Sequence, residues 1–243
     1  MSDTKTRDGQ TAIITGAARG IGAAVARKLH TEGAHVRLFD LDPAVESLVA
    51  ELGERADHHI LDVTDPDAWE PALAGRRTDV LVTCAGILGP QGPITEVDIA
   101  EWQQVIDVNL TGTFVASRAV LPSMIEQESG YLVYLASIGG KEGNAGQAAY
   151  CASKGGVITL AKSVSKEVAD HGILVNCVSP TMVEGPLVEA MEPWRREEIL
   201  KKIPLGRPAR PGEVAELVAW ACSSACTFTT GACFDLTGGR ATW

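Results

Sequence analysis

The sequence of 243 residues contains no uninterrupted run of about eighteen apolar residues, and the first residues, Met1 to Lys5, lack the apolar stretch of a secretory signal. These absences predict a cytoplasmic protein that does not enter a membrane. Positive charge is also scarce, since 21 Lys and Arg stand against 31 Asp and Glu, for a net charge of -10. Such a chain is not attracted over long range to nucleic acid, acidic membranes or strongly acidic proteins. A small ligand in a local pocket remains compatible.

Spacings typical of metal ligands are missing as well. The five histidines follow no such pattern with cysteines or carboxylates, and Cys222 and Cys226, four apart on a predicted helix, supply only two ligands. We therefore expect no metal site. The cysteines are scattered and four lie in apolar contexts, which favours free buried thiols over disulfides. They are Cys84, Cys151, Cys177, Cys222, Cys226 and Cys233.

Short β-rich runs alternate with amphipathic helical patterns along the whole chain. This alternation predicts an α/β fold in which a doubly wound parallel sheet of about seven strands carries helices on both faces. With 45% hydrophobic residues, we expect a single domain over residues 1–243. The expected strands are 11–15, 35–39, 58–61, 79–84, 131–135, 174–178 and 233–236.

One segment, residues 181–210, interrupts the alternation with prolines, glycines and charges. It also contains a helical patch at residues 194–200. A long irregular insertion in a compact domain is usually a functional loop, so we expect a substrate lid here. Its wall would be mixed apolar and acidic, with Met182, Glu184, Leu187, Met191 and Trp194.

Glycines mark the turn between the first strand and the first helix, in the sequence Thr15-Gly-Ala-Ala-Arg-Gly-Ile-Gly22. Gly16, Gly20 and Gly22 let the backbone approach a pyrophosphate, while the N-terminus of the helix that begins near Ile21 offers unpaired N–H groups. The spacing G-x3-G-x-G differs from the commoner G-x-G-x-x-G, and a purely structural turn is the alternative. The position of the turn between strand and helix favours a dinucleotide site.

Asp40 ends the second strand, twenty residues after Gly20. A carboxylate there accepts hydrogen bonds from ribose hydroxyls and repels a 2′-phosphate, so NAD is favoured over NADP. Arg19 in the glycine turn favours NADP instead, because its guanidinium can pair with the 2′-phosphate. Asp62 and Val63, after the third strand, would lie beside the adenine.

Tyr150 and Lys154 lie four residues apart in a stretch of small residues, so on a helix they share one face. A nearby ammonium would lower the pKa of the phenol and make it a proton acceptor. Ser137 stands thirteen residues upstream, after the fifth strand, where open α/β sheets bind ligands. The alternatives are a surface contact for the Tyr–Lys pair and a helix cap or turn residue for Ser137.

Together these motifs resemble the short-chain dehydrogenase/reductase family over essentially the whole chain. The resemblance implies a Rossmann-type fold, a nicotinamide cofactor and reversible hydride transfer with an alcohol or carbonyl. It assigns Tyr150 to proton transfer, Lys154 to the nicotinamide ribose, Ser137 to the substrate oxygen and Asn109 to an ordered water. A helix-bending role is the alternative for Asn109. The further residues it places at the cofactor are Ala85, Gly86, Pro180 and Val183.

Two stretches depart from the family pattern. The usual Asn-Asn-Ala-Gly is Thr83-Cys84-Ala85-Gly86 here, so both amides are lost and a strand-stabilising contact is in doubt. After the sixth strand, the usual Pro-Gly is Pro180-Thr181, and Gly185 replaces a threonine, which removes a side-chain contact to the cofactor. Val183 would still offer backbone groups to the nicotinamide amide.

These observations predict an NAD-dependent alcohol dehydrogenase or carbonyl reductase that acts on a small secondary alcohol or ketone, such as a polyol or sugar derivative. One alternative is an NADPH-dependent 3-oxoacyl-carrier reductase, which Asp40 and the acidic charge disfavour. Another is a dinucleotide-binding regulator without catalysis, which has no use for Ser137, Tyr150 and Lys154 together. The final segment, residues 235–243, resembles the family's subunit-contacting end and predicts a homo-oligomer, a tetramer.

Overall fold

A single parallel sheet forms the centre of the protein in a computed structural model that describes residues 6–189 and 191–241. Met1 to Lys5 and the end of the segment 235–243, beyond residue 241, lie outside the described residues. The seven strands lie in the order β3-β2-β1-β4-β5-β6-β7, all neighbours parallel, which confirms the predicted sheet. The strands are β1 (Thr11–Thr15), β2 (His35–Asp40), β3 (Ala56–Ile60), β4 (Val80–Thr83), β5 (Gly130–Leu135), β6 (Ile173–Pro180) and β7 (Cys233–Leu236).

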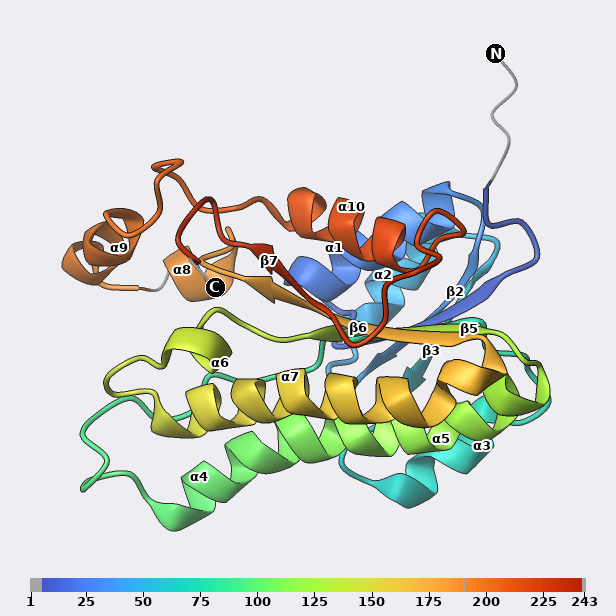
Figure 1. The fold of residues 1–243 in the computed structure, drawn as a ribbon, viewed down its shortest axis with the longest axis horizontal. Helices are drawn as coiled ribbons and strands as arrows, with labels where there is room; N and C mark the ends of the chain where they lie inside the picture. The colour runs from blue at the N-terminus through green and yellow to red at the C-terminus, as the bar shows by residue number, and fades with distance from the viewer. Residues whose placement is uncertain (1–5, 190, 242–243) are drawn as a thin grey trace.

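Helices cover both faces of this sheet in three layers (Figure 1). One face carries α1 (Gly20–Thr31), α2 (Val45–Leu52) and α10 (Pro211–Ala221). The other carries α3 (Trp69–Leu73), α4 (Ile99–Ile106), α5 (Gly112–Glu126) and α7 (Ala148–Val168). The shorter pieces are η1 (Pro66–Ala68), η2 (Asp107–Thr111), α6 (Gly139–Glu142), η3 (Ala169–His171), α8 (Pro186–Glu189) and α9 (Pro193–Leu200).

Alternate residues of the central strands enter two separate apolar cores. Ile13 of β1 packs among the residues under α5 and α7, and its neighbour Ile14 packs among those under α1 and α10. Leu81 and Val82 of β4 divide in the same way. Since successive side chains of a strand point to opposite faces, a strand between two helical layers must be apolar throughout. This explains the continuous apolar runs in the sequence.

The strand order reverses at β1, which has β2 on one side and β4 on the other. In open α/β sheets, ligands bind at such a reversal, beyond the carboxyl ends of the strands. Ser137, the glycine turn and Pro180 all lie at this edge because each ends or follows a strand. Helices α6, α8 and α9 gather at the same end of the molecule (Figure 1).

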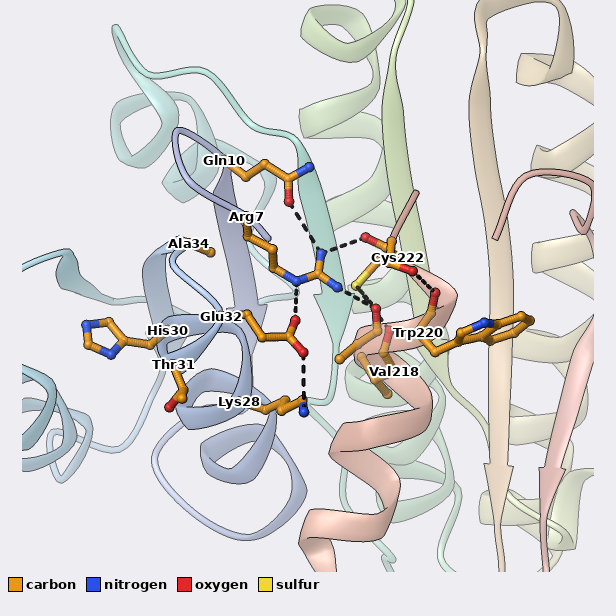
Figure 2. Close-up of polar contacts among 12 residues, drawn as sticks. Arg7, Gln10, Lys28, His30, Thr31, Glu32, Ala34, Val218, Trp220 and Cys222 are labelled. Atoms are coloured by element: carbon orange, nitrogen blue, oxygen red, sulfur yellow. Dashed lines mark hydrogen bonds and ion pairs between the residues drawn. The ribbon is translucent and has the colours of Figure 1, made fainter. Parts of the chain in front are cut away.

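A buried arginine ties the beginning of the described chain to α10 and to the end of α1 (Figure 2). The Arg7 side chain is 4% exposed; its Nε donates to Glu32 at 2.5 Å and its Nη1 to the Cys222 carbonyl at 2.7 Å. Nη2 donates to the Ala219 carbonyl. Arg7 therefore satisfies carbonyls at the C-terminal end of α10, which no further helical turn can reach.

The segment 181–210 is more ordered than a plain loop. It contains α8 and α9, and α9 confirms the predicted helical patch. Val183 forms a single parallel bridge with Ala209, and Met182, Val188 and Ile203 make a small apolar core of their own. No helix within the described residues is long and apolar enough to span a membrane.

Candidate active site

The glycine turn brings the backbone of β1 against the loop that follows β4. A Cβ at Gly16 would lie 2.6 Å from the Ala85 nitrogen, and a Cβ at Gly22 would lie 2.1 Å from the Gly16 carbonyl oxygen. Gly16 also has a φ of +64°, which side chains disfavour. Glycine is therefore required at both positions for the strand, the turn and α1 to meet. The N-terminus of α1, with Ile21 in its first turn, faces this edge.

Asp40 is bound to the glycine turn. Its Oδ2 accepts from the Ala18 N–H at 2.8 Å and its Oδ1 from the Asp42 N–H at 2.9 Å. These bonds hold the carboxylate beside the turn, where the second lone pair of each oxygen can accept a hydroxyl. Arg19 is exposed and forms an ion pair with Asp42 at 3.4 Å. Two carboxylates thus lie near the only cation of the turn.

The other predicted adenine-side residues follow β3 and β4. Asp62 is exposed and accepts from the backbone and hydroxyl of Thr64, at 2.9 and 2.7 Å, while Val63 is buried against Gly112. The Ala85 N–H donates to the Thr15 hydroxyl at 3.2 Å. The loop after β4 is therefore held to β1 without the amides that the family pattern has at positions 83 and 84.

Tyr150 and Lys154 lie on one face of α7, as their spacing predicts. The Lys154 Nζ is 6.0 Å from the centre of the Tyr150 ring and donates to the Leu135 carbonyl, at the end of β5, at 2.6 Å. Lys154 is 6% exposed. The Ser137 hydroxyl hydrogen-bonds with the Tyr150 phenol, so the structure brings Ser137, Tyr150 and Lys154 together.

Burial shapes the protonation of this group. Desolvation lowers the pKa of the Lys154 ammonium to about 8, because a charge is disfavoured away from water, and Cys84 opposes this shift. Burial also raises the pKa of the Tyr150 phenol, and the hydrogen bond with Ser137 opposes it. Desolvation is the larger effect, so the pKa of Tyr150 is raised overall, although the spacing predicts that Lys154 lowers it.

Asn109 is fully buried in η2, a π-helical segment between α4 and α5. Its Oδ1 accepts from the Ile87 N–H at 2.8 Å, and its Nδ2 donates to the Ile87 carbonyl at 2.9 Å and to Ser153 at 3.0 Å. A Cβ at Gly86 would lie 3.1 Å from Asn109 Oδ1 and 3.4 Å from Lys154 Nζ. Asn109 thus holds the loop at Gly86 next to Lys154. Such π-segments are frequent at functional sites.

The chain after β6 closes the far side of the site. The Pro180 carbonyl accepts from the Ile138 N–H at 3.0 Å, so it lies beside the residue after Ser137. The bridge to Ala209 uses the Met182 carbonyl and the Glu184 N–H, so the backbone groups of Val183 point the opposite way. Gly185 has no side chain to contact a cofactor. The Leu187 side chain lies outside the described part of the structure.

Some features of the site have no signal in the sequence. The thiol of Cys84, a partly buried residue, lies near Lys154, and desolvation raises the pKa of this thiol to about 12. The Leu135 carbonyl, the partner of Lys154, is a backbone group that no pattern singles out. All six cysteines are free thiols, as expected, although only Cys177, Cys222 and Cys226 are fully buried.

A parallel sheet that reverses at β1, with a glycine turn and a Ser, Tyr and Lys group at the reversal, defines the class of Rossmann-type oxidoreductases. A family model described as Enoyl-(Acyl carrier protein) reductase matches residues 16–240. The chain belongs to the short-chain dehydrogenase/reductase family and is an oxidoreductase, which confirms the resemblance noted in the sequence.

Two curated relatives are 39% identical to this chain. One is 2-dehydro-3-deoxy-L-rhamnonate dehydrogenase (NAD(+)) of a Sphingomonas species, with 97% of this chain and 96% of the relative covered. The other is cis-4-hydroxycyclohexanecarboxylate dehydrogenase of Sinomonas cyclohexanicum, with 94% and 95% covered. A crystal structure of 3-oxoacyl-[acyl-carrier protein] reductase from Brucella melitensis has a TM-score of 0.94 at 33% identity, with 98% and 94% of the chains covered.

Proposed function

We propose that the protein is an NAD-dependent dehydrogenase that oxidises a small secondary alcohol to its ketone, reversibly. The observation that carries this is the meeting of the Ser137 hydroxyl, the Tyr150 phenol and the Lys154 ammonium at the carboxyl end of β5. When bound, the nicotinamide accepts the hydride from the carbinol carbon. The names of the two curated relatives support a substrate in which the alcohol belongs to a sugar acid or to an alicyclic acid.

Each group of the site has a role in this proposal. Tyr150 accepts the hydroxyl proton as the hydride leaves, and Ser137 donates a hydrogen bond to the same oxygen. Lys154 binds the nicotinamide ribose and favours the phenolate. Asn109 holds the loop of Ala85 and Gly86 and an ordered water beside Lys154. In the ketone-to-alcohol direction, Tyr150 returns the proton to the oxygen.

The preference for NAD rests on the second strand. Asp40 is hydrogen-bonded in place beside the glycine turn, and Arg19 is paired with Asp42. A 2′-phosphate would meet Asp40 and would have to compete with Asp42 for Arg19. The NAD(+) in the name of the rhamnonate relative supports the same preference. In the proposed fit, Gly16, Gly20, Gly22 and Ile21 face the pyrophosphate, Asp62 and Val63 the adenine, and Pro180 and Val183 the nicotinamide.

An NADPH-dependent 3-oxoacyl-carrier reductase is the competing proposal, because a solved structure named 3-oxoacyl-[acyl-carrier protein] reductase has the same fold. Titration of NADH and NADPH fluorescence, followed by a screen of secondary alcohols with NAD⁺, separates the two. The panel includes hydroxycyclohexanecarboxylates and sugar acids. Tighter binding of NADH and oxidation of an alcohol in the panel support the dehydrogenase. Tighter binding of NADPH, with reduction of a 3-oxoacyl thioester, supports the reductase.

We also propose that residues 181–210 act as a lid, that the enzyme works in the cytoplasm and that it forms a homotetramer. The small core of Met182, Val188 and Ile203 lets the segment move as a unit. Six free thiols suit a reducing compartment.

A nearly apolar groove of about 470 Å³ lies between α5 and α7, with Phe114 half exposed beside it, and offers a surface to a second copy of the chain in the proposed tetramer.

A further inference from the structure

The short helix α6 directly follows Ser137 and controls its position. The Gly139 N–H donates to the Ser137 hydroxyl oxygen at 3.1 Å, and the Gly140 N–H donates to the Ser137 carbonyl at 2.9 Å. A Cβ at Gly140 would lie 2.6 Å from the Lys154 carbonyl carbon, so α6 packs backbone to backbone on α7. Any shift of α6 therefore moves the hydroxyl of Ser137 relative to Tyr150 and Lys154.

Two largely buried cations join α6 to residues 235–241, the C-terminal segment of the described chain. Arg240 donates to Glu142 through Nη2 at 2.7 Å and Nε at 3.0 Å, and Lys141 pairs with Asp235 at 2.7 Å. The Arg240 side chain is only 8% exposed. Both N–H groups of Arg240 donate to the same Glu142 oxygen, Oε2, and charged hydrogen bonds with this degree of burial restrict the guanidinium to one position.

Arg240 also determines how the side-chain amide of Asn144 is oriented. Its Nη2 lies 3.4 Å from Asn144 Oδ1. A guanidinium has no acceptor, so the amide oxygen must face Arg240 and the Nδ2 donor must face away from it. Asn144 Nδ2 and the Ser137 hydroxyl oxygen lie 3.1 and 3.5 Å from the point that a Gly139 Cβ would occupy. The Asn144 amide and the Ser137 hydroxyl thus border the same point next to Gly139.

The same C-terminal segment contacts the end of the proposed lid. The Gly238 carbonyl accepts from the Leu205 N–H at 3.1 Å, and a Cβ at Gly238 would lie 2.7 Å from the Ile203 side chain. Figure 1 shows the segment after β7 passing among the helices at this end of the molecule. Arg240 therefore lies on a segment shared by the lid and by the helix that positions Ser137.

Resting on the proposed oxidation of a secondary alcohol at Ser137 and Tyr150, we infer that Asn144 determines substrate specificity and that Arg240 positions it. The Asn144 amide donates a hydrogen bond to a second substrate oxygen, on the carbon next to the reacting one. The substrate class is then an alcohol with a neighbouring hydroxyl or carbonyl oxygen, as in polyols and hydroxy ketones. An alcohol without that oxygen leaves the Asn144 donor unpaired in the complex and is oxidised less well.

The test compares two substrates that differ by one hydroxyl, cyclohexanol and cyclohexane-1,2-diol, with NAD⁺. Wild-type kcat/KM should favour the diol by about tenfold or more. Asn144→Ala and Arg240→Met should each lower kcat/KM for the diol by about tenfold and change that for cyclohexanol by less than about threefold. The Kd for NADH should not change. Arg27→Met, which breaks the exposed pair with Glu51, is the matched control and should change neither substrate.

A double variant separates positioning from general damage. Because Arg240 acts through Asn144, Asn144→Ala with Arg240→Met should lose no more preference for the diol than either single variant. Arg240→Lys keeps the charge opposite Glu142 but has no fork to orient Asn144, so it should recover thermal stability and not the diol preference. Equal losses on both substrates, or additive losses in the double variant, would overturn the inference.

Failure of the proposed function has a different signature. A wild-type protein that binds NADH but oxidises neither compound nor any alcohol in the wider screen counts against the dehydrogenase proposal. The link between Arg240 and Asn144 is then measured by a double-mutant cycle in urea unfolding, without turnover. Zero coupling free energy in that cycle overturns the positioning role of Arg240 by itself.

Discussion

The ammonium of Lys154 lies 6.0 Å from the centre of the Tyr150 ring, one helical turn along α7. Lys154 is almost completely buried and donates to the Leu135 carbonyl, and no carboxylate among the described residues forms an ion pair with it. A buried cation without a counter-charge is unfavourable for folding, and proteins retain such groups mainly where function needs them. The buried position of Lys154 therefore supports the proposed role of this residue at Tyr150 and at a bound ribose.

Replacing Lys154 with methionine should stabilise the fold and abolish activity. Since the pKa falls to about 8 from an ordinary 10.5, removing the charge should raise the free energy of unfolding at pH 7 by about 1 to 3 kcal/mol. Below pH 8 the lysine is charged in both states, and the full destabilisation is present. Between pH 8 and about 10.5 the folded protein has released a proton that the unfolded chain still binds, so wild-type stability from this group rises with pH.

Urea unfolding of wild type and Lys154→Met at pH 7 and at pH 10 measures this difference. The advantage of the variant should shrink at the higher pH. A variant less stable than wild type at pH 7, or an advantage that grows with pH, would show that Lys154 has a stabilising partner in the fold.

Asp40→Ser should move cofactor preference towards NADP. The substitution removes the charge that repels a 2′-phosphate and keeps a hydroxyl near the ribose. We expect the ratio of kcat/KM for NADP⁺ to that for NAD⁺ to rise by about tenfold or more, an energy difference of about 1.4 kcal/mol. Asp67→Ser, at an exposed carboxylate of η1, is the matched control. An unchanged ratio in the Asp40 variant would mean that another group selects the cofactor.

Arg7→Met should weaken the fold and leave catalysis intact. The variant leaves Glu32 without its partner and the carbonyls at the end of α10 without a donor, for a loss of about 2 to 4 kcal/mol in urea unfolding. Arg27→Met, which breaks an exposed pair, should lose less than about 1 kcal/mol. Arg7 precedes β1 and lies far from its carboxyl end, so kcat should stay within about twofold. A large fall in kcat would contradict a purely structural role.

Phe114→Glu should disrupt the proposed tetramer. A charge beside the apolar groove of α5 and α7 cannot be buried against a second copy without a large desolvation cost. Light scattering after size exclusion should show the tetramer mass for wild type and a smaller one for the variant. Phe228→Glu, at a fully exposed phenylalanine, is the matched control. A wild-type monomer, or a variant of unchanged mass, contradicts this interface.

Much of the fold follows from local patterns in the sequence. Every strand lies within a few residues of its predicted range, and the central strands, such as β1 with Ile13 and Ile14, are predictable because strands buried on both faces need continuous apolar runs. The helical face shared by Tyr150 and Lys154 follows from a spacing of four. The π-helical segment at Asn109 does not follow from such a pattern, and the contacts of this segment with α7 join residues far apart in the sequence.

The electrostatics of the site were harder to predict. Arg240 and Glu142 are 98 residues apart, and Lys141 and Asp235 are 94 apart, so no local pattern pairs them. The pKa of Tyr150 is raised because burial outweighs the charge that the spacing suggests, and burial depends on the whole fold. Sequence patterns thus indicate which groups meet, and the packing around them decides their protonation.

The most direct test of the proposed chemistry is the turnover of Tyr150→Phe with NAD⁺ and an alcohol that the wild-type enzyme oxidises. Tyr134→Phe is the matched control, because that buried phenol bonds to Ser117 under the sheet, away from Ser137. We predict that Tyr150→Phe binds NADH with wild-type affinity and loses at least about a hundredfold in kcat, while Tyr134→Phe keeps its activity. Wild-type turnover by Tyr150→Phe would contradict the role of Tyr150 as the proton acceptor.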